Sequence, residues 1–342
     1  MILNAAPNSA EMPLDSDLDD EVDAEFVLGG TPADFSPITL TLEPSHCGQR
    51  LDKVVAGLVP QFSRSRLQQW FDEGHIMVDG KPAKGKSTAY GDETIVVVPQ
   101  PAPEDTAYTP EAIALDIVYE DDAIIVINKP AGLVVHPGSG NWSGTLLNGL
   151  LHHCPQLVSV PRAGIVHRLD KDTSGLMVVA KTLEAHTDLV RQLAARTVAR
   201  EYVAVARGDV TRATIVDAPI GRHPIQRTTM AVVAKGKPAR THVKVIERFG
   251  AATLLRCTLE TGRTHQIRVH LAAIGHPLVG DPSYGPGHAA GMPAFARQAL
   301  HATRLTLVHP VSRKTMTWDS PPPNDLAGLI EQLRATRAPA VR

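Results

Sequence analysis

The chain has 342 residues, 43% of them hydrophobic and 20% charged, which indicates a globular protein of about two domains. Its three cysteines, Cys47, Cys154 and Cys257, are far apart and odd in number, a pattern that argues against a disulfide framework and against a zinc finger. No apolar run has the length of a membrane span, and the N-terminus lacks the regions of a signal peptide. We therefore expect a cytoplasmic protein with no membrane association.

The formal net charge of −2 hides an uneven distribution of charge. Residues 1–49 hold ten acidic residues and no Lys or Arg, which leaves 34 bases against 26 acids, a net +8, in the rest of the chain. A basic body behind an acidic tail favours a polyanionic partner, although a modest +8 is equally consistent with solubility alone. Because the acidic segment shows no apolar periodicity, we predict that residues 1–37 are a disordered tail.

Residues 38–98 have the pattern of a small domain. Apolar residues recur at i, i+3, i+4 and i+7 over 51–58, which predicts a helix that Pro60 ends. Ser63 can cap a second helix, and Gly74 suits the left-handed conformation at its end. The segment thus predicts two consecutive short helices.

A hairpin follows these helices, with its turn at Asp79-Gly80, and 94–98 is a closing strand. This order, and the stretch SRSRLQQWFDEGHIMVDGKP, resembles the S4-type RNA-binding module, so we expect a small α/β unit that grips RNA phosphates. A generic solvated helix pair is the alternative, and Asp72 and Glu73 dilute the positive patch. The bases expected on the exposed side are Arg50, Lys53, Arg64, Arg66, Lys81, Lys84 and Lys86.

Four prolines between positions 99 and 110 predict a stiff linker over 99–112 and a domain boundary. From 113 to 320 short strand patterns outnumber helices and do not alternate with them regularly. We therefore expect an α+β domain with a mixed, largely antiparallel sheet flanked by helices and loops, followed by a C-terminal helix and tail over 321–342. The strand candidates are 117–119, 124–127, 165–167, 176–180, 201–206, 242–246, 253–259 and 305–308, and the helix candidates are 144–153, 183–195 and 325–335.

Four polar segments of this domain could carry chemistry, of which 128–133 is on its own only a turn. The charged loop 167–175 lies between two apolar runs, where a reactive group can be held rigidly, but on its own it is equally a salt-bridged turn. Tyr202 could be a core ring, a base-stacking platform or a proton-transfer group. Segment 260–271 is rich in donors and suits phosphate or carboxylate binding. Its two histidines, His265 and His270, are five apart and not at the spacing of a helical zinc pair, so we expect no metal.

These segments occur together in a recognisable order. HRLDKDTSG, with KPAGL upstream, EYVAV between and TGRTHQIRVHLAAIGHPLVGD downstream, resembles the RluA/RluD-type pseudouridine synthase family over 113–320. The module order, the length and the segment RHP at 222–224 are closest to the RluD branch. The resemblance implies the pseudouridine synthase fold and an enzyme that modifies large-subunit (23S) ribosomal RNA, in a hairpin at the subunit interface. It implies no cofactor, and nothing in the sequence demands more than a monomer.

The resemblance also assigns roles. Asp170 is the expected nucleophile and Asp172 only its neighbour, with attack on the ribose favoured. Arg168 matches the arginine that replaces the flipped uridine in the RNA, and Tyr202 the tyrosine that stacks on the base and assists proton transfer. Arg268 matches the arginine that pairs with the catalytic carboxylate and favours its ionised form.

Three alternatives stay open at this point. The enzyme could modify another ribosomal or transfer RNA site. The chain could instead be a non-catalytic RNA-binding or ribosome-assembly protein, which the presence of Asp170, Tyr202 and Arg268 disfavours. A sugar- or nucleoside-hydrolysing enzyme would need two separated carboxylates, whereas Asp170 and Asp172 lie in one loop.

Overall fold

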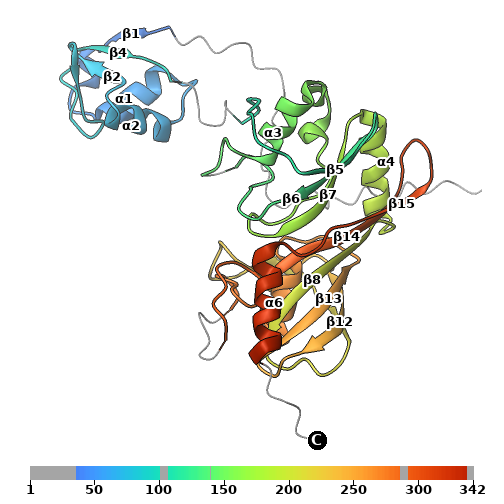
Figure 1. The fold of residues 1–342 in the computed structure, drawn as a ribbon. Coiled ribbons are helices and arrows are strands. Elements are labelled where there is room, and N and C mark those ends of the chain that lie inside the picture. The colour runs from blue at the N-terminus through green and yellow to red at the C-terminus, as the bar shows by residue number, and fades with distance from the viewer. Residues whose placement is uncertain (1–35, 101–106, 139, 286–291, 337–342) are drawn as a thin grey trace, which may run out of the picture. The chain divides into compact units, whose positions relative to one another are not determined.

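The computed structural model describes residues 36–100, 107–138, 140–285 and 292–336. Nearly all of the acidic segment expected to be disordered, and the end of the C-terminal segment, lie outside these residues. The described chain forms two compact units, one before the gap at 101–106 and one that begins at Ala107 (Figure 1).

The small unit is a four-stranded antiparallel sheet, in the order β1-β4-β2-β3, with two helices packed on it. The predicted caps are confirmed: the Ser63 hydroxyl accepts a hydrogen bond from the Arg66 amide, and Gly74 has φ +79°. Strand β1, a four-residue edge strand, was not predicted, although Ile38 and Leu40 alternate with threonines and pack against the core. The bounds are β1 Ile38–Thr41, α1 Leu51–Leu58, α2 Arg64–Asp72, β2 Ile76–Val78, β3 Lys81–Pro82 and β4 Thr94–Val97.

The large unit is built on a nine-stranded sheet in the order β5-β6-β7-β14-β8-β13-β12-β9, with β15 paired to β14. Among the strands that the structure describes in this sheet, only β7 and β14 pair in parallel, so the predicted α+β class with a mixed, largely antiparallel sheet is confirmed. A separate hairpin consists of β10 Ile220–Arg222 and β11 Met230–Val232. The sheet strands are β5 Ile117–Glu120, β6 Ile124–Lys129, β7 Ser174–Ala180, β8 Ala199–Arg207, β9 Thr214–Asp217, β12 Arg240–Arg248, β13 Ala252–Leu259, β14 Leu300–Val308 and β15 Thr315–Asp319.

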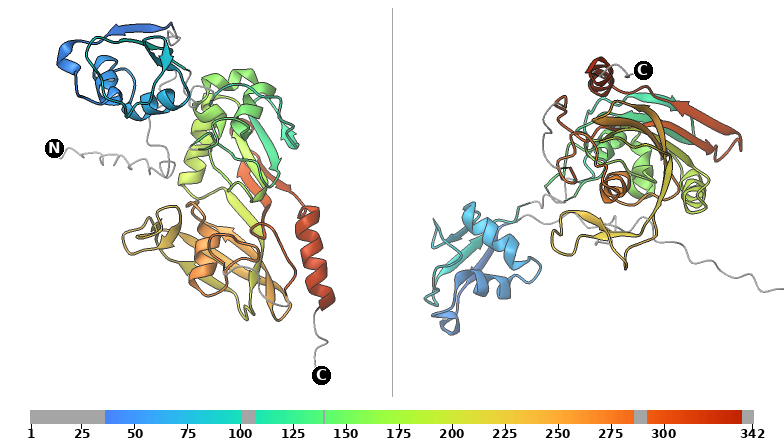
Figure 2. Two further views of the ribbon diagram at one scale, coloured as in Figure 1. Left: turned by 90° about the vertical axis from the view of Figure 1, so that its left-hand side faces the viewer. Right: turned by 90° about the horizontal axis from the view of Figure 1, so that it is seen from below.

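Helices cover both faces of this sheet (Figures 1 and 2). Successive side chains of a strand point to opposite faces, so Ile125 and Ile127 belong to the core cluster that includes α3 and α5, while Ile124 and Val126 belong to the one that includes α4. The same alternation on β8 turns Tyr202 toward the α5 side. The helices are α3 Leu146–His153, α4 Leu183–Ala194, α5 Gln266–Ala273 and α6 Asn324–Thr336.

The structure corrects three expectations. Residues 107–112, assigned to the linker, belong to the large unit, since the Ala107 carbonyl accepts a hydrogen bond from the buried Asn148 amide. The C-terminal helix is also part of that unit, because α6 buries its apolar side against Val205. The expected strand 165–167 makes only one isolated bridge, from Ile165 to β7, after a short 3-10 turn. No described helix is long and apolar enough to cross a membrane.

Candidate active site

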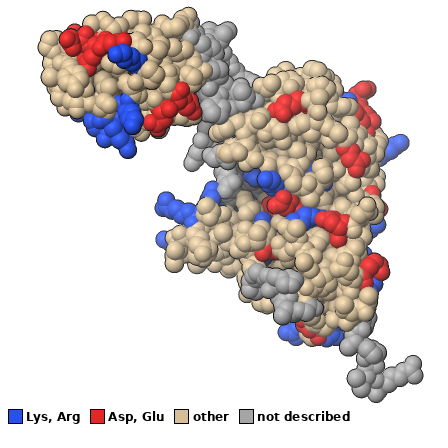
Figure 3. Space-filling view, turned by 60° about the vertical axis from the view of Figure 1, so that its left-hand side comes forward, with Lys and Arg blue, Asp and Glu red and all other residues tan. Residues whose placement is uncertain are grey.

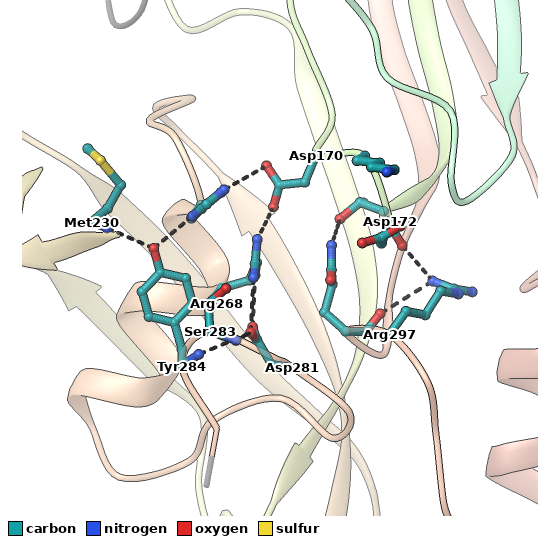
Figure 4. Close-up of polar contacts among 12 residues, drawn as sticks. Asp170, Asp172, Met230, Arg268, Asp281, Ser283, Tyr284 and Arg297 are labelled. Carbon is teal, nitrogen blue, oxygen red and sulfur yellow. Dashed lines mark hydrogen bonds and ion pairs between the residues drawn. The ribbon is translucent and has the colours of Figure 1, made fainter. Parts of the chain in front are cut away.

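Asp170 and Arg268 face each other from a loop and a helix. The loop that leads into β7 carries Asp170, and Thr173 donates its backbone N–H to the Asp170 carbonyl, which closes a tight turn. Arg268, on α5, donates from Nη1 to Oδ2 of Asp170 at 3.0 Å (Figure 4). The Asp170 side chain keeps 19% of its surface exposed and that of Arg268 only 5%. The pair therefore presents a paired carboxylate that a substrate can still reach.

A second carboxylate holds the arginine from behind. Asp281 accepts from Nε of Arg268 at 2.8 Å and from Nη2 at 2.9 Å, and its side chain is fully buried. Burial by itself raises the pKa of Asp281, but hydrogen bonds from Arg268 and the charge of Arg268 lower it below its ordinary value. Asp281 also accepts the backbone N–H groups of Ser283 and Tyr284. The Asp281 carboxylate is therefore ionised, and both of its oxygens accept hydrogen bonds.

His265 and Tyr284 complete the surroundings of Asp170. Nε2 of His265 lies 3.9 Å from Oδ1 of Asp170, and Nδ1 of His265 lies 2.7 Å from the Tyr284 hydroxyl. The Tyr284 oxygen accepts the backbone N–H of Met230, and the guanidinium of Arg268 lies 5.0 Å from the centre of the Tyr284 ring (Figure 4). Sequence reasoning missed these roles, although His265 and Asp281 lie within the quoted downstream motif.

Tyr202 and Arg168 occupy different environments near this loop. Tyr202 is 5% exposed and shares a core cluster with Leu169 and Ile267, the neighbours of Asp170 and Arg268. Burial raises the pKa of Tyr202, so its hydroxyl is protonated at neutral pH. Arg168 is exposed. Burial is the main cause that lowers the pKa of His265, and the positive charge of Arg168 adds to this effect. The structure thus places all four predicted residues of the large unit around one loop.

The KPAGL segment, which looked like a plain turn, supports this loop from one side. Lys129 is fully buried, and its Nζ donates to the carbonyls of Pro130, Leu133 and Lys171 at 2.8 to 2.9 Å. Gly132 donates its backbone N–H to the same Lys171 carbonyl. The residue after Asp170 is therefore held by two donors.

The segment before β14 supports the loop from the other side. Arg297 donates from Nη1 to the Asp172 carbonyl at 3.0 Å, and the Gln298 amide donates to the Thr173 hydroxyl. Gly175 has φ +117°, and a Cβ there would lie 2.2 Å from the Ala302 carbonyl oxygen, so only glycine fits. On the face shown in Figure 3, acidic and basic side chains gather near the middle of the large unit.

The basic residues of the small unit lie in three different environments. Arg50 and Arg64 both donate to the buried carboxylate of Asp52, and their side chains remain 47% exposed. Lys53 and Lys81 are exposed. Arg66, also expected at the RNA surface, is half-buried. Among the described residues, no group of His, Cys, Asp or Glu could hold a metal ion.

Comparisons with known proteins agree with this fold. The family model described as RNA pseudouridylate synthase matches residues 123–273, and the S4 domain model matches 49–92. The chain belongs to the RNA pseudouridylate synthase family: it is a pseudouridine synthase that carries an S4 RNA-binding domain. Both resemblances seen in the sequence are thereby confirmed.

Named relatives cover most of the chain. "Ribosomal large subunit pseudouridine synthase D" of Nitrosomonas europaea is 56% identical over 310 residues, covering 89% of this chain and 90% of that protein. The protein of the same name from Escherichia coli (strain K12) is 52% identical over 309 residues, covering 87% and 94%. Among solved structures, "Human RNA Pseudouridylate Synthase Domain Containing 1" matches with a TM-score of 0.50 and 28% identity, over 67% of this chain and 98% of that one.

Proposed function

We propose that this enzyme converts uridine to pseudouridine in large-subunit ribosomal RNA, with Asp170 as its nucleophile. The relatives named for that RNA support the substrate, since they align with this chain over about nine-tenths of their length. The observation that supports Asp170 as the nucleophile is its ion pair with Arg268, which holds the carboxylate in place while leaving it accessible.

One carboxylate is sufficient for this isomerisation. Attack of an Asp170 oxygen on C1′ breaks the N1–C1′ bond, and the electron pair leaves with the uracil. The base then turns, C5 bonds to C1′, and the carboxylate is released with its electron pair. C5 loses its proton and N1 gains one, so no water is consumed and no second carboxylate is required. Arg268 holds the attacking carboxylate in place through the hydrogen bond from Nη1 to Oδ2 of Asp170.

The other site residues fit a flipped nucleotide. A uridine must leave the RNA helix to reach a buried loop, at a cost of about a few kcal/mol. Arg168, exposed two residues before Asp170, would fill the space that the base leaves. The ring of Tyr202 would stack on the base, and its protonated hydroxyl would take part in the proton transfers.

The RNA target is proposed more finely as a hairpin of large-subunit RNA at the subunit interface. The S4 domain would hold that RNA by its phosphates, through Arg50, Lys53, Arg64, Arg66 and Lys81. We expect the enzyme to act as a monomer, in the cytoplasm, on pre-ribosomal particles. A different ribosomal or transfer RNA uridine is the second candidate, because the same catalytic loop would serve uridines in several RNAs.

The test combines a variant with mapping of the product. Asp170→Asn should lower pseudouridine formation in large-subunit RNA by at least about 10³-fold. Asp172→Asn is the matched control in the same loop, since Arg297 binds the backbone carbonyl of Asp172 and not its side chain. A wild-type rate in the Asp170→Asn variant would contradict the assignment of Asp170 as the nucleophile. A wild-type enzyme that modifies only transfer RNA would overturn the target and leave the nucleophile standing.

A further inference from the structure

The contacts around Asp170 form a chain that continues beyond Arg268. Met230 N–H donates to the Tyr284 oxygen at 2.9 Å, the Tyr284 hydroxyl meets Nδ1 of His265 at 2.7 Å, and Nε2 of His265 faces Oδ1 of Asp170 at 3.9 Å. Arg268 occupies the other oxygen, Oδ2. Each oxygen of the carboxylate is therefore faced by a different group.

The direction of this chain follows from the imidazole. Burial lowers the pKa of His265, so the ring is neutral at neutral pH and carries a single proton. If Nδ1 held that proton, the lone pair of Nε2 would point at a carboxylate oxygen, which is repulsive. The favoured tautomer carries the proton on Nε2 and accepts the Tyr284 O–H at Nδ1. Every group then donates toward Asp170.

The backbone and the packing hold this arrangement in place. His265 has φ +56° at the start of α5, a left-handed conformation in which histidine is one of the better-tolerated residues. Tyr284 packs against a small cluster of Met230, Val269 and Ile220, which joins the β10–β11 hairpin to α5. The position of the hairpin is thus linked to His265 through one hydroxyl group.

We infer that His265 and Tyr284 are positioning residues that orient the carboxylate of Asp170 for attack and link it to the β10–β11 hairpin. This inference rests on the proposed role of Asp170. At 3.9 Å the N–H of His265 orients the carboxylate by its dipole, and contacts of this kind are often longer in a substrate-free enzyme than in its substrate complex. Residues 218–239, which contain the hairpin, hold four bases and no acid, as a surface that contacts RNA phosphates requires.

Tyr284→Phe removes only the hydroxyl. The His265 ring then loses the group that fixes its tautomer, so kcat should fall about 10- to 100-fold, the effect of a small misplacement of a reacting group. KM for the RNA should stay within about twofold, since no phosphate contact is removed. The matched control is Tyr119→Phe, which removes a hydroxyl that donates to Asp121 beside β5 and should leave kcat unchanged.

The histidine is tested by two variants with the same backbone strain. Gln and Ala both lack the tolerance of His for φ +56°, so their comparison isolates the side-chain donor. His265→Gln keeps an N–H near the position of Nε2 and should retain several-fold more kcat than His265→Ala. Equal kcat in these two variants, at equal thermal stability, would show that the donor has no role.

A double-mutant cycle decides whether Tyr284 acts through His265. If it does, adding Tyr284→Phe to His265→Ala should cost little further kcat, because the group that it positions is already absent. Fully additive losses would overturn the link between the two residues. These results are read only against a wild type that forms pseudouridine. A wild type with no activity on large-subunit RNA would instead contradict the proposed function.

Discussion

Arg268 binds Asp281 through Nε and Nη2, so Nη1 is the nitrogen that it offers to Asp170. The buried carboxylate of Asp281 therefore fixes the plane of the Arg268 guanidinium and, with it, the direction of the hydrogen bond to Asp170. A lysine at this position would have no planar fork with which to bind both carboxylates in this way.

The first prediction concerns the stability of this arrangement. Arg268→Ala leaves Asp281 buried with its counter-charge removed, so the free energy of unfolding should fall by about 3–5 kcal/mol. Arg240→Ala is the control, because its pair with Asp217 is 44% and 54% exposed and should contribute less than about 1 kcal/mol. Urea unfolding measures both. Equal losses in the two variants would show that burial of Asp281 is unimportant.

The second prediction is a pH dependence caused by Lys129. Burial lowers the pKa of Lys129 from 10.5 to about 8, so between these values the unfolded chain binds more protons than the folded one. Stability contributed at this position therefore rises as the pH increases from about 8 toward 10.5. Lys129→Met lacks this titration. The difference in unfolding free energy between wild type and variant should change over that range, and a constant difference would contradict the shift.

The third prediction separates the ring of Tyr202 from its hydroxyl. Tyr202→Phe keeps the ring, so affinity for RNA should stay within about twofold while pseudouridine formation falls about 10²- to 10⁴-fold, the usual contribution of a proton-transfer group. Tyr202→Leu should also weaken binding of the flipped base, by about 1–3 kcal/mol. Single-turnover rates and binding isotherms give the two quantities. Full activity in Tyr202→Phe would limit this residue to stacking.

The fourth prediction concerns the S4 domain. Lys53→Ala and Lys81→Ala remove exposed charges, so each should weaken RNA binding and reduce the slope of log K against log salt by about 1 if it contacts a phosphate. Arg50 and Arg64 share Asp52, and replacing either should have a smaller effect on the slope. Measuring affinity at several salt concentrations tests this order. An unchanged slope in both lysine variants would place the RNA elsewhere on the domain.

The sequence pattern predicted those helices and strands that have one apolar side and one polar side. Helix α1 and the hairpin of the small unit followed from apolar spacing and from the Asp79-Gly80 turn, and α4 from a one-sided apolar pattern. Helix α5 was missed because polar and apolar residues alternate from Gln266 to Leu271, a period of two that is typical of a strand, and all six are buried in the helix. Strand β15 was missed because its pairing with β14 depends on tertiary contact.

From the sequence, only those site residues could be predicted that lie at matching positions of the family motifs. Lys129 looked like part of a turn, since its role arises from the Lys171 carbonyl, 42 positions away. Asp281 and Tyr284 contribute through contacts with Arg268 and His265 that no local spacing encodes. Their chemistry becomes visible once α5 and the following loop are brought together.

The parallel ladder between β7 and β14 pairs only Ser174 and Gly175 with His301 and Ala302, and it is the shortest ladder of the large sheet among the described residues. Asp170 comes from the β7 side of this seam, and Arg268 and Tyr202 come from the other. The ion pair of Asp170 with Arg268 thus links the two parts of the sheet across this short ladder. Because the core clusters on both faces of the sheet also cross this ladder, loosening of the join would separate the carboxylate from its arginine only together with part of the core.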